Sequence, residues 1–61
     1  MKITKETAIA AIKGAYAAYC EVAGKKIDVS LKLCSSIANK LYMGFGISVT
    51  TLFVEEVLLS D

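Results

Sequence analysis

Few side chains in this 61-residue sequence could perform chemistry, and the strongest candidates are Cys20 and Cys34. A cysteine nucleophile needs an activating base or a helix N-terminus, and the chain contains no histidine. Two cysteines without histidine also cannot complete a four-ligand zinc site within one chain. We therefore predict that both thiols are buried and inert, and we expect neither a metal nor a cofactor.

Hydroxyl and carboxyl pairs do not supply an alternative active site. The pairs Ser35–Ser36 and Thr50–Thr51 have no histidine to activate them. Glu55 and Glu56 are sequence neighbours, which point about 100° apart on a helix and so cannot share a proton on one face. The sequence favours a protein that is not an enzyme.

One glycine-flanked segment, Gly44-Phe45-Gly46, could present backbone N–H groups to an anion. No lysine or arginine lies beside it, so we interpret Gly44 or Gly46 as a helix stop and Phe45 as a hydrophobic plug. A sponge that binds a small anionic ligand between subunits, through lysine and tyrosine side chains, remains an alternative function.

The glycines divide the chain into three segments, and the pattern predicts an all-α, three-helix domain over residues 1–61. The first helix is expected at 5–23, with Thr4 as its N-cap and Gly24 just past its end. The second is expected at 28–44, with Asp28 as its N-cap.

The second and third segments also carry strand signals. Apolar and polar residues alternate across 26–33, so the alternative is a short strand there followed by two helices. The third helix is expected at 48–59 after Ser48, although its β-branched residues favour strands.

The outer two segments each have two apolar faces, more than a three-helix monomer of this size can cover. Hydrophobic residues make up 56% of the chain. We therefore predict a helical homo-oligomer, with the small residues of the first helix and the apolar residues of the third at its interface. The expected interface residues are Ala10, Gly14, Ala18, Phe53, Val57 and Leu58. Tyr16, Tyr19 and Tyr42 are the expected surface for another partner, because tyrosine suits interfaces.

Charge and cysteine content restrict the compartment and the partners. The formal net charge is +1, too little to attract phosphate groups strongly. The longest uncharged stretch, residues 41–54, is shorter than the ~20 residues that span a bilayer, so we expect no membrane association. Two cysteines are fewer than a secreted chain of this length normally uses, which favours the cytoplasm.

The run Ile37-Ala38-Asn39-Lys40-Leu41, followed by residues 46–52 (Gly-Ile-Ser-Val-Thr-Thr-Leu), resembles the helix-turn-helix of bacterial repressors. It departs from that family by four extra residues, 42–45, and the implied recognition helix carries two glutamates and no basic residue. A strand followed by two helices also resembles a ribbon-helix-helix repressor. These resemblances imply a small DNA-binding repressor as an alternative function.

The combined interpretation is a small binding protein without enzymatic activity, acting as a regulator, inhibitor or adaptor. It is expected to work as a homo-oligomer that occludes a macromolecular partner. The expected partners are a second copy of the chain and another protein, and nucleic acid is the alternative. Its short length and its composition, poor in cysteine and without arginine, fit a chain encoded by a phage or another mobile element.

Overall fold

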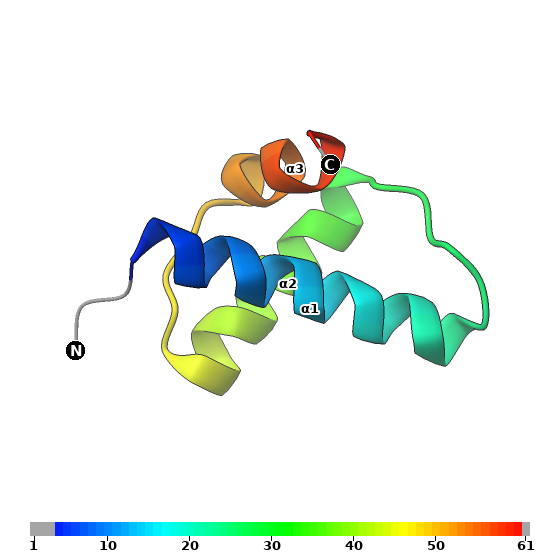
Figure 1. Ribbon diagram of the computed structural model, residues 1–61, viewed down its shortest axis with the longest axis horizontal. Coiled ribbons are helices and arrows are strands. Elements are labelled where there is room, and N and C mark those ends of the chain that lie inside the picture. The colour runs from blue at the N-terminus through cyan, green and yellow to red at the C-terminus, as the bar shows by residue number, and fades with distance from the viewer. Residues whose placement is uncertain (1–3, 61) are drawn as a thin grey trace.

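The computed structural model describes residues 4–60, which form three helices and no strand. Helix α1 runs over Lys5–Ala23, α2 over Leu31–Phe45 and α3 over Thr51–Leu59. Each helix contacts the other two. Figure 1 shows α1 crossing α2, with α3 lying along one side of the pair. The all-helical, three-helix prediction is therefore confirmed, whereas residues 1–3 and 61 of the predicted domain lie outside the described residues.

A residue with a hydroxyl side chain caps the N-terminus of each of the three helices. The N-caps Thr4, Ser30 and Thr50 have extended backbones, and each side-chain oxygen accepts a hydrogen bond from the backbone N–H three residues later. These bonds measure 3.0 to 3.2 Å. Such caps satisfy backbone donors that the first turn of a helix leaves without a partner.

Two glycines end α1 and α2. Gly24 and Gly46 have φ values of 74° and 70°, in the left-handed region that L-amino acids with side chains rarely adopt. After Gly24 the chain closes a Schellman motif, in which the Lys25 N–H donates to the Cys20 carbonyl oxygen at 3.2 Å. The predicted limits of the first helix are confirmed, and Gly46 rather than Gly44 ends the second.

The alternative interpretation, a short strand at 26–33, is wrong. Residues 26–30 form a connection without strand pairing, and residues 31–33 already belong to α2. The alternation arises because Ile27 and Val29 are half-buried while Asp28 and Ser30 face outward, as the connection passes over the rest of the fold. The predicted starts at Asp28 and Ser48 are likewise two to three residues early, since Ser30 and Thr50 are the caps.

One apolar core lies between the helices. In the described part of the chain no polar or charged residue is fully buried. The buried residues come from all three helices and from the α2–α3 connection: Ala8, Ile12, Cys34, Ile37, Ala38, Leu41, Ile47, Val54 and Val57. These side chains are aliphatic or small, and the aromatic rings lie around them at the surface or partly buried.

Candidate interaction surface

Large apolar side chains stand on the outside of this small fold. Val22 is 90% exposed and Phe45 is 69% exposed, so neither contributes much to the core. Exposed apolar residues mark an interaction site only where they lie together, whereas single scattered ones are common on protein surfaces. The large hydrophobic residues exposed among those described are Val22, Leu31, Tyr42, Met43, Phe45, Leu52 and Leu59.

Two of these residues border a groove along α1. A hollow of about 380 Å³ has apolar walls from α1, from the end of α2 and from the α2–α3 connection. A smaller hollow of about 110 Å³ adjoins it and shares Ala15, Ala18 and Lys40 with it. We call the two hollows together the α1 groove; its lining is Ala11, Gly14, Ala15, Ala18, Tyr19, Val22, Lys40, Phe45 and Ile47.

The helical repeat explains why α1 forms one wall of this groove. Ala11, Ala15, Ala18 and Val22 are separated by four, three and four residues, which places them on one stripe of the helix. Alanine side chains are short, so the stripe is a shallow depression rather than a ridge. Phe45 forms the opposite wall because it is the last residue of α2 and is followed at once by the turn at Gly46.

Lys40 lies on the rim of the groove. Its Nζ atom is 6.0 Å from the centroid of the Tyr19 ring, within the range of a weak cation–π interaction. The ammonium group is thus drawn over the half-buried ring at the edge of the groove. Lys40 is the charged residue of the groove lining.

The structure does not bring the six predicted interface residues onto one surface. Ala10, Gly14 and Ala18 of α1 are all exposed, and the latter two line the groove. Val57 is buried in the core of the single chain, where it has 6% exposure. Phe53 and Leu58 are half-buried and line two other hollows.

The three tyrosines predicted as a partner surface have different environments. The Tyr16 hydroxyl donates a hydrogen bond to the backbone carbonyl of Ile27, and its ring is half-buried. Tyr19 lies beneath Lys40. Tyr42 alone is largely free, at 60% exposure on α2. Tyr16 and Tyr19 are neighbours on α1, three residues apart, whereas Tyr42 belongs to α2.

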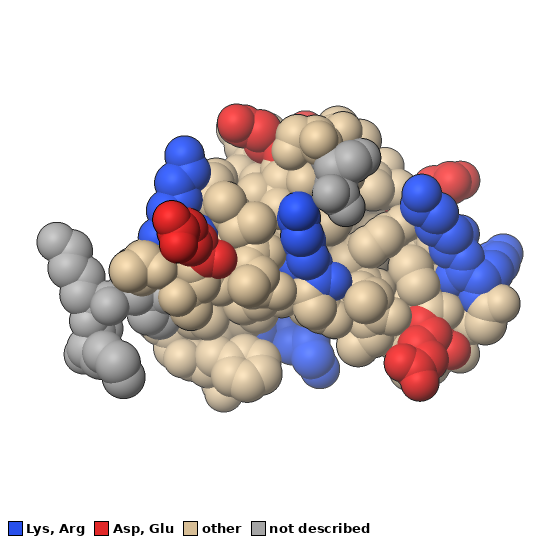
Figure 2. All heavy atoms as spheres, viewed as in Figure 1, with Lys and Arg blue, Asp and Glu red and all other residues tan. Residues whose placement is uncertain are grey.

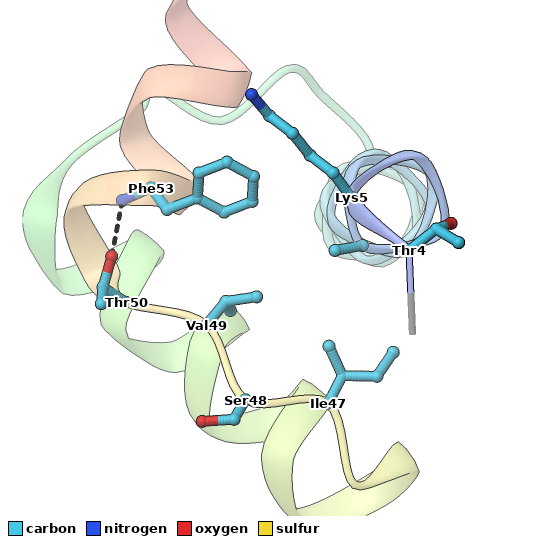
Figure 3. A pocket seen from close by; sticks show the side chains of 8 residues that line it. Thr4, Lys5, Ile47, Ser48, Val49, Thr50 and Phe53 are labelled. Carbon is cyan, nitrogen blue, oxygen red and sulfur yellow. Dashed lines mark hydrogen bonds between the residues drawn. The ribbon is translucent and has the colours of Figure 1, made fainter. Parts of the chain in front are cut away.

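A separate hollow, of about 400 Å³, lies outside the α1 groove, between the start of α1 and the α2–α3 connection. Figure 3 shows Lys5 on one side and Ile47, Val49 and Phe53 on the other. Its two helix N-termini are occupied by their own caps, because the Thr4 and Thr50 hydroxyl oxygens already accept hydrogen bonds from within their helices. The remaining lining is mostly apolar, so the hollow offers an anion little beyond the Lys5 ammonium group.

The two cysteines are separate free thiols with different environments. Cys34 is buried, and this burial, together with the negative charge of Glu55, raises the pKa of its thiol. Cys20 is half-buried, and its Sγ atom accepts a hydrogen bond from the Ile27 N–H at 3.4 Å. The burial predicted for both thiols is complete for Cys34 and partial for Cys20. Among the described residues, no three potential metal ligands lie together.

The segment that resembles a helix-turn-helix folds as two helices, α2 and α3, joined by residues 46–50. The outward positions of α3 are Leu52, Glu56 and Leu59, all exposed. A recognition helix with an apolar and acidic outer face is poorly suited to a groove lined by phosphates. No helix within residues 4–60 is both long enough and apolar enough to cross a membrane.

The comparisons add no relative, because no protein-family model, curated protein or solved structure matches this chain.

Sequence reasoning identified the small residues Gly14 and Ala18 but missed the groove. Phe45 was interpreted as a plug and is instead exposed at the groove wall. The signal available in the sequence was the evenly spaced stripe from Ala11 to Val22, which shares a helix face without charged residues. Phe45 and Ile47 join it only through the crossing of α1 and α2, which sequence spacing does not reveal.

Proposed function

We propose that this chain is a binding protein without enzymatic activity, which associates with itself and occludes a macromolecular partner as a regulator, inhibitor or adaptor. One observation carries the proposal: a core of small and aliphatic side chains is surrounded by large apolar residues that remain exposed, among them Val22, Phe45 and Leu52. A 61-residue domain buries only about 60% of its unfolded surface, so association that covers further apolar area would stabilise it.

The solution mass tests self-association directly. Light scattering and native mass spectrometry over a range of protein concentrations should give a small integral multiple of the 6.5 kDa chain. The multiple should fall on dilution, because association follows mass action. A mass of 6.5 kDa at all concentrations, together with cooperative unfolding, would contradict the proposal.

The outer face of α3 is the surface that we assign to the macromolecular partner. Leu52, Glu56 and Leu59 lie on one side of that helix, at positions i, i+4 and i+7, and are exposed. Two leucines beside a carboxylate fit a protein surface that is apolar and basic. A candidate partner protein should lose affinity for Leu52→Glu and Leu59→Glu but bind Lys32→Gln normally. Equal binding of all three variants would exclude this face.

The DNA-binding and anion-sponge alternatives remain hypotheses with less support. A repressor should bind random duplex DNA at about 50 mM salt and lose affinity steeply as salt rises. A sponge should unfold at a higher temperature when its anion is added. From the acidic and apolar face of α3, we expect no change in the anisotropy of labelled duplex DNA at low salt.

A further inference from the structure

We propose that a second copy of this chain fills the α1 groove, with the two α1 helices antiparallel and related by a two-fold axis that passes between residues 16 and 17. In this pair Val22 of each copy enters the hollow beside Ala11, Gly14 and Phe45 of the other. This inference specifies how the proposed self-association occurs, and it depends on that proposal.

The spacing of the groove stripe is self-complementary. Read in either direction, Ala11, Ala15, Ala18 and Val22 are separated by four, three and four residues. A two-fold axis between residues 16 and 17 therefore places Ala11 opposite Val22 and Ala15 opposite Ala18. A symmetric dimer needs such a surface, because each patch must contact its own copy.

Val22 and the larger hollow are complementary, because an exposed side chain lies at one end of the stripe and an empty hollow at the other. Val22 is the most exposed of the large hydrophobic residues described, at 90%, and it stands at one end of the stripe. The hollow of about 380 Å³ stands at the other end, with no side chain of its own chain filling it. A Cβ atom added to Gly14 would meet no atom within 4 Å, so nothing within the chain requires a glycine there. A valine from a second copy would use that space, and symmetry fills both hollows at once.

Charge favours the antiparallel direction. Figure 2 shows acidic and basic side chains towards both ends of the molecule and further basic side chains between them. Glu6 lies in the first turn of α1, and Lys25 and Lys26 follow its end. Antiparallel pairing opposes the dipoles of the two α1 helices, which is favourable. Parallel pairing would align the two dipoles, which is unfavourable.

The contact area suits a dimer that dissociates readily. Helix α1 has 19 residues and is therefore about 28 Å long. A contact strip about 10 Å wide covers on the order of 300 Å² per chain, and Phe45 and the end of α2 add to it. The two chains together bury on the order of 600 Å² along the helices, below the roughly 1,000 Å² of a stable specific interface, so we expect a weak and readily reversible dimer.

The first test places a charge at position 22. Val22→Glu should leave the far-UV circular dichroism of the helices intact, because the side chain is outside the core, and should weaken dimerisation at least tenfold in analytical ultracentrifugation. The matched control Leu52→Glu places the same charge on an exposed apolar position of α3 and should leave the dimer unchanged. Dissociation by Val22→Glu alone supports the groove dimer.

The second test fills the larger hollow of the α1 groove with a side chain at position 14. Gly14→Leu should raise the thermal midpoint of the monomer, measured in the Val22→Glu background, because leucine is the better helix former and its Cβ has open space. In the wild-type background the same change should abolish the dimer, because leucine occupies the space meant for Val22. Opposite effects on folding and association distinguish a blocked interface from a damaged fold.

Cross-linking fixes the direction of the helices. The double variant Ala11→Cys/Val22→Cys should form disulfides between residues 11 and 22 of different copies, identified by peptide mass spectrometry. Single Val22→Cys should not link to itself, because the two copies of residue 22 lie about 16 Å apart along the helices. A wild-type monomer would overturn both this dimer and the proposed function. A wild-type oligomer that survives Val22→Glu and Gly14→Leu would overturn this interface and leave the proposed self-association standing.

Discussion

The Tyr16 hydroxyl donates a hydrogen bond to the backbone carbonyl of Ile27, eleven residues farther along the chain. The Ile27 N–H donates in turn to the Sγ atom of Cys20 at 3.4 Å. Both backbone groups of one residue in the α1–α2 connection are therefore paired with side chains of α1. Ile27 itself is half-buried, so these bonds hold a connection without regular secondary structure against the helix that precedes it.

The Tyr16→Phe variant should weaken the fold measurably. It removes the donor to the Ile27 carbonyl while keeping the ring, and a partly buried acceptor loses its partner. We expect the unfolding equilibrium constant to rise roughly twofold to tenfold, measured by urea denaturation. Tyr42→Phe is the control, since Tyr42 is exposed and should give the wild-type midpoint. Equal midpoints for Tyr16→Phe and Tyr42→Phe would show that the bond adds nothing to stability.

The same tyrosine should make stability fall at alkaline pH. Partial burial, followed by the hydrogen bond to Cys20 and the negative charges of Cys20 and Asp28, raises the pKa of Tyr16 above its ordinary value of 10.0. The folded state therefore holds the phenol proton more tightly than the unfolded state does. This contribution is fully present below about pH 10 and is lost as the pH rises through the raised pKa. Tyr16→Phe should lose less stability than the wild type as the pH rises above about 10, and parallel pH profiles would contradict the assignment.

Two glycines at the end of α2 should respond to alanine in opposite directions. Gly46→Ala forces a Cβ atom into the left-handed region at φ 70° and should cost about 1 kcal/mol. Gly44 lies inside α2, and an added Cβ atom meets nothing within 4 Å, so Gly44→Ala should stabilise by up to about 1 kcal/mol. Urea midpoints of the two variants at equal protein concentration decide the matter. A Gly46→Ala variant as stable as the wild type would mean that Gly46 does not set the end of the helix.

The sequence was informative where a local signal decides the structure. Thr4 and Gly24 mark the limits of α1, and both act through hydrogen bonds within a few residues of themselves. The starts of α2 and α3 were misplaced because Asp28 and Ser48 are also N-cap residue types, whereas Ser30 and Thr50 are the caps. The strand alternative arose because Ile27 and Val29 alternate with polar residues. Alternation reports only that every second side chain is buried, and an extended connection lying on a core gives the same pattern.

The α1 groove could not be predicted from local sequence signals, because its two walls come from segments far apart in the chain. The α1 stripe could be located from its spacing, but its opposite wall comes from Phe45 and Ile47, more than twenty residues away in sequence. Likewise Val57 belongs to a helix that is apolar on most sides, and only the packing of α3 decides that it is buried while Leu52 and Leu59 are exposed. Periodicity identifies apolar faces, and the crossing of the helices determines which of them remain uncovered.

The two thiols should differ in their rates of alkylation. Cys34 is buried and burial raises its pKa, so at neutral pH it is a neutral thiol that reagents reach only through opening of the fold. Cys20 is half-buried and should react first with iodoacetamide. Peptide mass spectrometry at successive times gives both rates, and mild urea should accelerate Cys34 far more than Cys20. Rapid modification of Cys34 under native conditions would contradict its place in the core.

Lys40 should oppose the groove dimer, and its removal should strengthen it. The residue lines both hollows of the α1 groove beside Ala15 and Ala18, which face each other across the proposed two-fold axis. Two copies of Lys40 would then lie on the same side of the dimer near the axis, and like charges at such separations repel. Lys40→Gln should lower the dimer dissociation constant a few-fold at low salt in analytical ultracentrifugation, and the difference should shrink as salt screens the repulsion. Lys32→Gln, an exposed lysine of α2 outside the groove, should leave the constant unchanged. A weaker dimer for Lys40→Gln would place the two lysines apart and argue for a different pairing of the α1 helices.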